Sequence, residues 1–290
     1  MIRRFFFLLV AVLANSIACQ LQAADPPAPK IEVEESLFVD GEFDATITGG
    51  KFAGQTLFDN RELQQAAPKT NGLMLKKCTL DADIDVILKP FPKLKELYLI
   101  DCQLSPKTNL GKSARLADLT SFTSERTPLT DADLAFTARA KKLESLEVPG
   151  ANLKGTFLDG LAGSKSLLYL LLGENQIPDE KCEVFATIKS LRRLNLSQNG
   201  LSDKAAPALA KCTMLQILHL EKNKLTDAGG AQFARLTAID QLYLDDNKVT
   251  ARGLEGFRGS KTLRHLSVEN CGIDEAFLAA LRGSFQTVKK

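Results

Sequence analysis

An eleven-residue pattern recurs eight times along this chain, with leucine-type residues at its first, fourth, sixth and last positions. From one copy to the next, the fourth position shifts by 25 residues in the first step and by 24 residues in each of the other six steps. The residues at that position are Leu97, Phe122, Leu146, Leu170, Leu194, Leu218, Leu242 and Leu266. Such a fixed period predicts a stack of similar coils, because one coil alone cannot bury its apolar side.

One repeat illustrates the expected coil. In "LRRLNLSQNGLSD", Leu194 and Leu196 are two positions apart and so lie on one face of a strand, while Asn195 faces the other way. The following "KAAPALAKCTM" has apolar residues at helical spacing. Each repeat therefore predicts a strand, a turn and a helical return segment.

The ninth position of the pattern distinguishes the repeats. It is occupied by Cys78, Cys102, Thr127, Ala151, Asn175, Asn199, Asn223, Asn247 and Cys271. An asparagine amide in a turn can bond backbone groups of the neighbouring coil, so four successive asparagines predict a ladder. Because alanine forms no such bond and threonine only a different one, we expect residues 105–160 to be the least regular stretch.

These repeats resemble the leucine-rich repeat superfamily over about residues 70–283. The segments "LSDKAAPALA" and "LTDAGGAQFA" resemble the return helices of ribonuclease-inhibitor-like repeats and of 24-residue bacterial repeats with a Gly-Ala-x-x-Leu-Ala helix. The resemblance implies an α/β solenoid, a right-handed horseshoe with a parallel sheet on its concave side and helices on its convex side. It also implies recognition of a protein on the concave face.

The first residues predict export from a bacterial-type cell. "MIRRFFFLLVAVLANSIAC" has a basic start and an apolar core too short for a confident membrane span, which is typical of a signal peptide. We favour ordinary cleavage over lipid attachment at Cys19, because Ser16 stands where a lipobox usually has leucine. The protein is then expected to be secreted or held in the periplasm or cell envelope.

Four segments follow from this interpretation: a signal peptide at residues 1–24, a linker at 25–30, an N-terminal cap at 31–69, and a repeat domain at 70–290 that ends in a cap helix. Loss of residues 1–24 changes the formal charge from +2 to 0. No basic tract remains, which argues against nucleic-acid or anionic-membrane binding. No membrane span is expected in the mature chain, which we expect to be monomeric.

The cysteines and histidines do not have the spacing of a metal or catalytic site, and no cofactor is expected. Cys78 and Cys102 lie on adjacent repeats and could approach each other, but parallel stacking favours free thiols over a disulfide. His219 and His265 lie two repeats apart, about 10 Å by strand spacing, and in different columns. We therefore expect two separate surface histidines.

Three carboxylates lie at equivalent positions of successive repeats: Glu221, Asp245 and Glu269. Like charges at ~4.8 Å repel each other, so this column needs an explanation. Screening by water at the ends of the strands is the favoured explanation. A cationic partner, a metal ion or acid/base catalysis are the alternatives.

The residues that flank the strand leucines should form the exposed concave face. All three tyrosines of the chain fall in these two columns, and tyrosine and arginine are frequent in binding hot spots. We expect the partner-binding residues to be Tyr169, Leu171, Arg193, Asn195, His219, Tyr243 and Asp245.

The expected function is that of an exported, non-catalytic module that binds a protein through the concave face. One alternative is a cell-envelope scaffold or carbohydrate-binding protein, lipid-anchored through Cys19. Another is an enzyme that uses the column of Glu221, Asp245 and Glu269.

Overall fold

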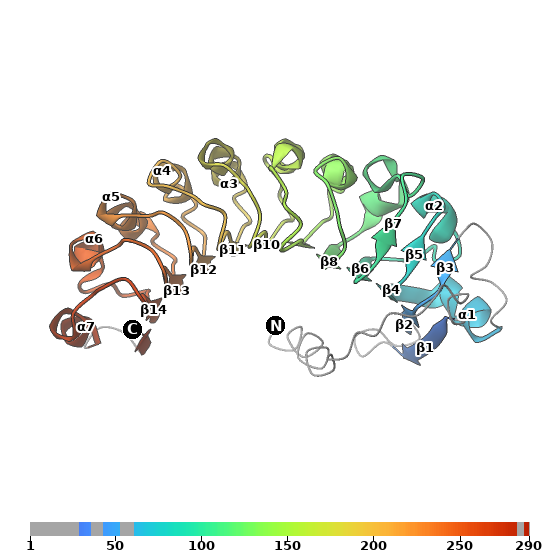
Figure 1. Ribbon diagram of the computed structural model, residues 1–290, viewed down its shortest axis with the longest axis horizontal. Helices are drawn as coiled ribbons and strands as arrows, with labels where there is room; N and C mark the ends of the chain where they lie inside the picture. Colours follow the sequence, from blue (N-terminus) through green and yellow to red (C-terminus); the bar gives the residue numbers. More distant parts are fainter. Residues whose placement is uncertain (1–28, 36–42, 53–60, 283–286, 290) are drawn as a thin grey trace, which may run out of the picture.

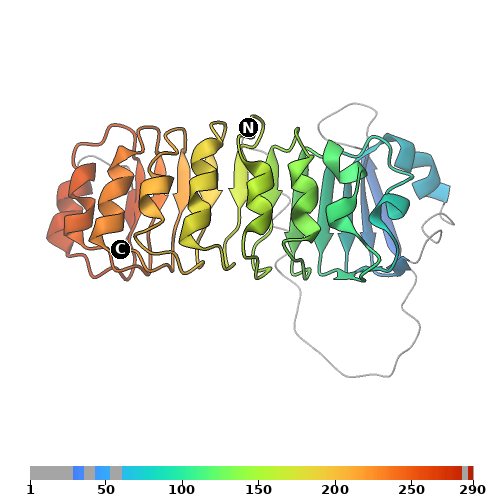
Figure 2. The same ribbon diagram turned by 90° about the horizontal axis from the view of Figure 1, so that it is seen from above.

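Repeated coils stack side by side into an arc, with strands along its inner, concave side and helices along its outer, convex side (Figure 1). The computed structural model describes residues 29–35, 43–52, 61–282 and 287–289. The expected signal peptide and most of the expected linker lie outside the described residues. From above, the helices form a row that covers one face of the sheet (Figure 2).

One sheet of twelve strands extends along the whole described stack. Its strands are β1 (Lys30–Glu35), β2 (Phe43–Thr48), β4 (Thr70–Lys76), β6 (Glu96–Ile100), β8 (Ser121–Glu125), β9 (Ser145–Glu147), β10 (Tyr169–Leu171), β11 (Arg193–Asn195), β12 (Ile217–His219), β13 (Gln241–Tyr243), β14 (His265–Ser267) and β15 (Thr287–Lys289). All neighbours pair in parallel except β1 and β2, which are antiparallel. A second, smaller sheet contains β3 (Lys51–Phe52), β5 (Thr79–Leu80) and β7 (Gln103–Leu104).

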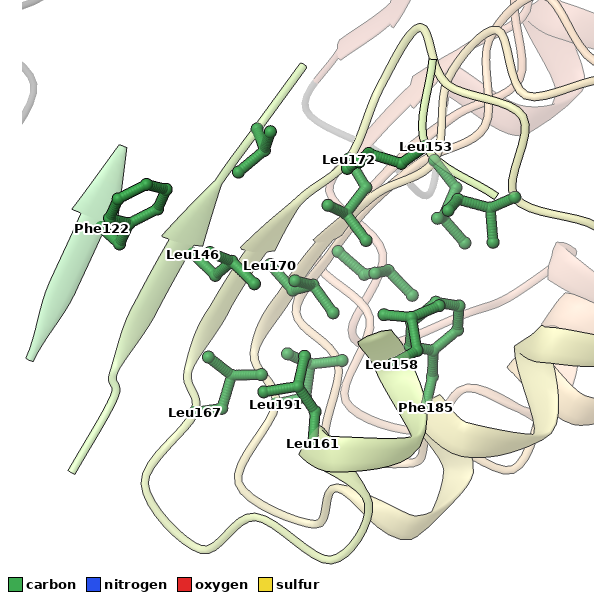
Figure 3. Packing of buried hydrophobic residues seen from close by; sticks show 14 of the residues in the cluster. Phe122, Leu146, Leu153, Leu158, Leu161, Leu167, Leu170, Leu172, Phe185 and Leu191 are labelled. Carbon is green, nitrogen blue, oxygen red and sulfur yellow. The ribbon is translucent and has the colours of Figure 1, made fainter. Parts of the chain in front are cut away.

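The strand leucines pair with one another from coil to coil. Leu170 is the register partner of Leu194, which pairs with Leu218, and Leu218 pairs with Leu242. All four side chains have 0% exposure. In Figure 3, Leu146 and Leu170 point from the strands into the layer that also contains Leu158 and Phe185 of the convex segments. The predicted shared core is confirmed.

Short helices connect the strands on the convex side. The α-helices are α1 (Arg61–Ala66), α2 (Ile84–Ile87), α3 (Glu183–Thr187), α4 (Ala206–Leu209), α5 (Asp227–Gly230), α6 (Ala251–Leu254) and α7 (Glu275–Arg282), and the 3-10 helices are η3 (Ala67–Lys69), η4 (Leu110–Lys112), η5 (Arg115–Asp118), η6 (Asp133–Ala138), η7 (Thr156–Leu161), η8 (Asp179–Cys182), η9 (Ala231–Arg235) and η10 (Glu255–Phe257). A 3-10 helix rises about 2.0 Å per residue against 1.5 Å for an α-helix, so it crosses a narrow coil with fewer residues. The expected helical returns are therefore short and largely of the 3-10 type.

The predicted asparagine ladder is present. Asn223 Oδ1 accepts hydrogen bonds from the backbone N–H groups of Asn199 and Leu201, at 3.2 and 2.9 Å. Its Nδ2 donates to the carbonyl groups of Leu196 and Leu220, at 3.0 and 2.9 Å. Asn175, Asn199 and Asn247 bond neighbouring coils in the same way. These amides are wholly or largely buried. They therefore form hydrogen bonds with backbone groups that water cannot reach.

A left-handed residue precedes the ninth position in each turn, which the sequence analysis did not predict. These residues are Lys77, Asp101, Arg126, Gly150, Glu174, Gln198, Lys222, Asp246 and Asn270, with φ between 48° and 65°. A non-glycine residue in this region costs roughly 1–2 kcal/mol. Four of the nine are glycine, asparagine or aspartate, which adopt this conformation more readily, but the other five are lysine, arginine, glutamate or glutamine, so residue type alone did not reveal the pattern.

The stretch from 105 to 160 is not the irregular part of the sheet. The pairing of β6 with β8 and of β8 with β9 continues without a shift. The register shifts instead between Phe43 and Asp44, where β2 meets β4. Our expectation was wrong for the sheet, because the strand pairing does not require asparagine at the ninth position. Thr127 still bonds the preceding coil, since its Oγ1 accepts from Cys102 N and donates to Leu99 O.

The two ends of the stack differ from simple caps. Residues 45–52 form a coil of their own, since β2 pairs with β4 and β3 pairs with β5. The antiparallel strand β1 then covers this coil at its outer edge. At the other end, α7 is followed by β15, which pairs with β14, so the sheet continues past the helix that we expected to close it.

Five cysteines lie among the described residues, and all five are buried free thiols. Cys78 Sγ is directed at the carbonyl of Lys76, and Cys102 Sγ donates to the carbonyl of Leu75 at 3.1 Å. The disulfide alternative is therefore wrong, because each thiol bonds backbone carbonyls in its turn. Burial raises the pKa of Cys182 and raises that of Cys212 to about 12. Over the described part of the chain, no helix has the length and apolar character needed to cross a membrane.

Candidate functional site

The strand register brings the expected partner-binding residues together on the concave face. In one column Tyr169 lies beside Arg193. In the other column Leu171, Asn195, His219 and Tyr243 follow one another on adjacent strands. All seven expected residues, including Asp245 in the turn after β13, are half-buried. They occupy β10 to β13 and the turn after β13, in the middle and C-terminal part of the inner arc (Figure 1).

Three aromatic side chains form what we call the aromatic ladder: His219, Tyr243 and His265. The ring centroids of His219 and Tyr243 are 4.2 Å apart, with 7° between the ring planes. The Tyr243 and His265 centroids are 4.8 Å apart, at 42°. Both faces of the Tyr243 ring are therefore contacted by imidazoles. A ligand on the concave face meets its ring edge and hydroxyl group.

A polar network extends from the aromatic ladder. Arg193 Nη2 lies 3.5 Å from His219 Nε2, and His219 Nδ1 lies 2.9 Å from Glu221 Oε1. The tautomer protonated at Nδ1 fits both contacts, because Nδ1–H then donates to the carboxylate and Nε2 accepts from the guanidinium. In this tautomer the imidazole links the guanidinium group of Arg193 to the carboxylate of Glu221.

Other polar side chains of the site hold the turns. Asn195 Oδ1 accepts from the N–H and the hydroxyl group of Ser197, at 2.9 and 2.8 Å. Asp245 Oδ1 accepts from Ser267 Oγ at 2.7 Å and from the backbone N–H of Glu269. Asn195 and Asp245 therefore also act within the sheet, which reduces their motion and their freedom to rearrange around a ligand.

The carboxylates Glu221, Asp245 and Glu269 line an open depression of about 400 Å³ at the edge of the concave face. Glu269 is exposed, as expected for charges screened by water, but the Glu221 side chain is only 22% exposed. Glu221 Oε2 is buried and has no hydrogen-bond partner among the described residues. The expectation of water screening is therefore wrong for Glu221, whose other oxygen is held at His219.

Burial also changes proton affinities on this face. It raises the pKa of Tyr243, whose hydroxyl group donates to Gln241 Oε1 at 3.1 Å. Burial raises the pKa of Glu147, against the opposing effects of the Ser145 hydrogen bond and the positive charge of Arg193. Within the described ranges, no three metal-ligating side chains gather into a cation site.

Sequence reasoning missed two members of this face. His265 was expected to be a separate surface histidine, but it shares Tyr243 with His219. The two histidines belong to different columns, and the diagonal neighbour on an adjacent strand is within reach of an aromatic ring. The register brings the two rings within reach of each other, but their contact also depends on side-chain direction. The desolvation of Glu147 was not readable, because it depends on how neighbouring side chains cover it.

Two family models and the structure of one internalin (inlF) agree with this architecture. Two family models described as leucine-rich repeat match residues 187–210 and 213–273. A structure of an internalin (inlF) from Listeria monocytogenes is 20% identical, covers 79% of this chain and 76% of its own, and has a TM-score of 0.54. A structure of internalin C2 (inlC2) from the same organism is 18% identical, covers 63% of this chain and 89% of its own, and has a TM-score of 0.45.

The search of curated proteins finds no match. At 20% identity, the similarity to inlF concerns the fold alone. The fold rests on three agreeing observations: the 24-residue period, the parallel concave sheet with its buried strand leucines, and the matching family models. This chain is a leucine-rich repeat protein.

Proposed function

We propose that this chain is a non-catalytic recognition module that binds a protein partner through its concave face, around the aromatic ladder. The observation that carries the proposal is the ordered contact of Arg193, His219 and Tyr243 on an open sheet. Aromatic and arginine side chains dominate binding hot spots because they combine contact area with polar reach. Their fixed orientation lowers the entropic cost of binding.

The shape of this face favours a macromolecule over a small substrate. Small-molecule sites enclose most of their ligand, whereas the depression beside Tyr243 is open. Catalysis by the carboxylate column would require a closed environment around its reacting groups. A long, half-buried row of side chains on parallel strands suits an extended or convex protein surface.

Carbohydrate recognition is less well supported. Sugars commonly bind by stacking on an exposed aromatic face, but His219 and His265 contact Tyr243 on both sides. The edge and the hydroxyl group that remain accessible are better suited to hydrogen bonding and to contacts with protein side chains. We therefore keep a protein as the proposed partner.

Export is part of the proposal and rests on the first residues of the sequence, which lie outside the described ranges. A basic start followed by an apolar segment supports a signal peptide. The binding site would then face the periplasm, the cell envelope or the exterior. Detection of the processed chain outside the cytoplasm, with a new N-terminus in the region of residues 19–25, would support this proposal.

The binding proposal is tested by affinity capture from cell-envelope extracts with the processed protein. The double variant Arg193→Ala/Tyr243→Ala should lose the captured protein while keeping the circular dichroism spectrum of the folded chain. A matched control, Lys204→Ala/Lys211→Ala, removes two exposed side chains from the convex side and should retain it. Equal capture by both double variants would refute binding at the concave face.

A further inference from the structure

Basic residues gather along one long edge of the solenoid, where each coil passes from its convex helix into its strand. Because β6 and β8 to β14 are parallel neighbours, the loops before these eight strands lie on one edge and the turns after them lie on the other (Figure 2). We call the first of these the basic edge. Its loops are residues 89–95, 114–120, 138–144, 162–168, 186–192, 210–216, 234–240 and 258–264.

The charge of the basic edge does not follow from composition. Its loops contain fifteen basic and three acidic residues, although the whole chain has 37 basic and 35 acidic residues. The seven-residue turns on the other edge, which begin three positions after each strand leucine, contain thirteen acidic and five basic residues. The two edges of the solenoid therefore carry opposite charge.

Backbone hydrogen bonds hold the loops of the basic edge in register from coil to coil. Gln216 N donates to Arg192 O and Asp240 N donates to Gln216 O, both at 2.8 Å. Residues that are 24 positions apart in the sequence thus lie on adjacent coils. We expected no binding to anionic membranes because no basic tract remains in the sequence, but stacking assembles such a surface from one to three basic residues in each loop.

Three exposed lysines occupy equivalent positions on three consecutive coils in the middle of this edge: Lys141, Lys165 and Lys189. Ser166 Oγ donates to Lys141 O at 2.9 Å, which joins the first two of these loops directly. The ion pairs of the basic edge, within the described ranges, involve other residues: Lys142, Lys211, Arg258 and Arg264. The positive charges of the three lysines are therefore not neutralised by carboxylates and add to one another along the edge.

An exposed apolar side chain lies in the same row of loops. Among the large apolar residues of the described chain, Val86 and Met214 are the two that are markedly exposed, each at 46%. Met214 belongs to the loop before β12, and Val86 lies in α2, which leads into the first loop. Phosphates of a nucleic acid would pair with the lysines but would give Met214 no apolar environment. A bilayer provides both, since its acyl layer begins directly beneath the headgroups.

We propose that the basic edge docks on the surface of an anionic lipid membrane, with its lysine and arginine side chains at the lipid phosphates and Met214 between the headgroups. Figure 1 shows the arc along its shortest axis, so each edge is a broad side of the arc. Such a side lets loops from all eight coils approach one surface together, and every basic residue near the phosphates strengthens the attraction. The concave face then opens parallel to the membrane, so the inference goes beyond the proposed function and is compatible with it.

The test measures binding of the processed protein to lipid vesicles by flotation in a density gradient. Vesicles made from equal parts of phosphatidylcholine and phosphatidylglycerol should carry the protein, vesicles of phosphatidylcholine alone should not, and salt should reduce the binding by screening. The variant Lys141→Glu/Lys165→Glu/Lys189→Glu should lower the partition coefficient at least about tenfold, because three positive charges at the phosphates become negative. Its circular dichroism spectrum should be unchanged, since the three side chains are exposed.

A matched control makes the same change in charge on the other edge. Lys154, Lys224 and Lys248 are exposed there, in the turns that follow the strands. The variant Lys154→Glu/Lys224→Glu/Lys248→Glu has the same net charge as the first variant and should bind anionic vesicles within about twofold of wild type. Equal weakening by both variants would overturn the inference, because it would indicate attraction by net charge alone.

An environment-sensitive fluorophore locates the contact without altering the lysines of the basic edge. Met214→Cys allows its attachment, since the five cysteines of the described chain are buried. Anionic vesicles should shift its emission to shorter wavelength and should leave the emission of the same label at Lys224→Cys, on the other edge, unchanged. Equal shifts at both positions, or no shift at 214, would overturn the inference. Binding of duplex DNA or oligoglutamate without binding of anionic vesicles would also overturn it, because the edge would then recognise another class of polyanion.

Discussion

The imidazole of His219 lies parallel to the phenol ring of Tyr243, with 4.2 Å between the ring centroids and 7° between the planes. The two residues are register partners on adjacent parallel strands, and neighbouring strands are separated by ~4.8 Å. The sheet therefore sets a ring spacing close to that of stacked aromatic rings. The same backbone register that builds the core also orders the binding face.

Removal of the central ring should destabilise the fold measurably. Tyr243→Ala loses two aromatic contacts and should lower the free energy of unfolding by about 1–3 kcal/mol. Tyr243→Phe keeps both contacts and loses only the hydrogen bond to Gln241, so its cost should stay below about 1 kcal/mol. Urea unfolding followed by circular dichroism measures both. Equal losses in the two variants would mean that the ring contacts contribute little.

Core and concave leucines should respond very differently to truncation. Leu218 has 0% exposure, and Leu218→Ala should cost about 2–5 kcal/mol through lost burial and a cavity. Leu171 is half-buried on the concave face, where water can fill the space, so Leu171→Ala should cost less than about 1.5 kcal/mol. Thermal unfolding of both variants tests the assignment. An unchanged melting temperature for Leu218→Ala would contradict it.

The asparagine ladder should stabilise the stack between coils. Asn223→Ala removes the acceptor of two backbone N–H groups and should cost about 2–4 kcal/mol, because these groups stay buried. Asn195→Ala is the control, since the Asn195 side-chain oxygen bonds Ser197 within its own coil. Its cost should be about 1 kcal/mol or less. Similar losses for the two variants would refute a role of the ladder between coils.

Ser124 stands at a core position where the other repeats mostly have a large apolar residue. It is 1% exposed, and its hydroxyl oxygen has no hydrogen-bond partner among the described residues. Ser124→Ala should therefore raise the free energy of unfolding by about 1 kcal/mol. Ser121→Ala, at a half-buried concave position, should change it by less than about 0.5 kcal/mol. Destabilisation by Ser124→Ala would indicate that the hydroxyl group has a partner.

The convex aspartates should make stability depend on pH. The Asp227 carboxylate accepts from Thr250 N at 2.6 Å and from Thr250 Oγ1 at 2.9 Å. The hydrogen bond from the Thr250 backbone N–H holds the pKa of Asp227 below its ordinary value of 3.8. Because the folded state has the lower pKa, this contribution is present above the unfolded pKa and is lost as pH falls through the folded value.

Comparison of wild type with Asp227→Ala isolates that contribution. The stability difference between the two proteins should be largest near pH 7 and should shrink as the pH falls below about 4. Urea unfolding at a series of pH values measures it. A difference that stays constant down to about pH 2 would mean that the ionised carboxylate is not what stabilises this turn.

The core and the two concave columns were predictable because they depend on period alone. Leu218 and Tyr243 point to opposite faces of their strands by simple alternation, and the 24-residue step aligns them with their neighbours. The asparagine ladder was also predictable, since the turn position recurs at the same step. Local pattern and tertiary structure agree in these features.

Features that depend on side-chain packing were not predictable. The sequence places Glu221 at the end of a strand, where water is the natural expectation, yet contact with His219 leaves one of its oxygens buried. The left-handed conformation of Lys222 depends on hydrogen bonds of neighbouring turns, and nothing in lysine itself favours it. His265 reaches Tyr243 diagonally, a contact that depends on side-chain direction as well as register.

Site-directed photo-crosslinking can show which side of the solenoid contacts the partner. A photo-reactive amino acid replaces Ile217, which lies between Arg193 and Gln241 on the concave face, or Lys204 on the convex side. After illumination in cell-envelope extracts, we expect a discrete protein adduct from position 217, abolished by Arg193→Ala/Tyr243→Ala, and none from position 204. An adduct formed from position 204 but not from 217 would contradict recognition through the concave face.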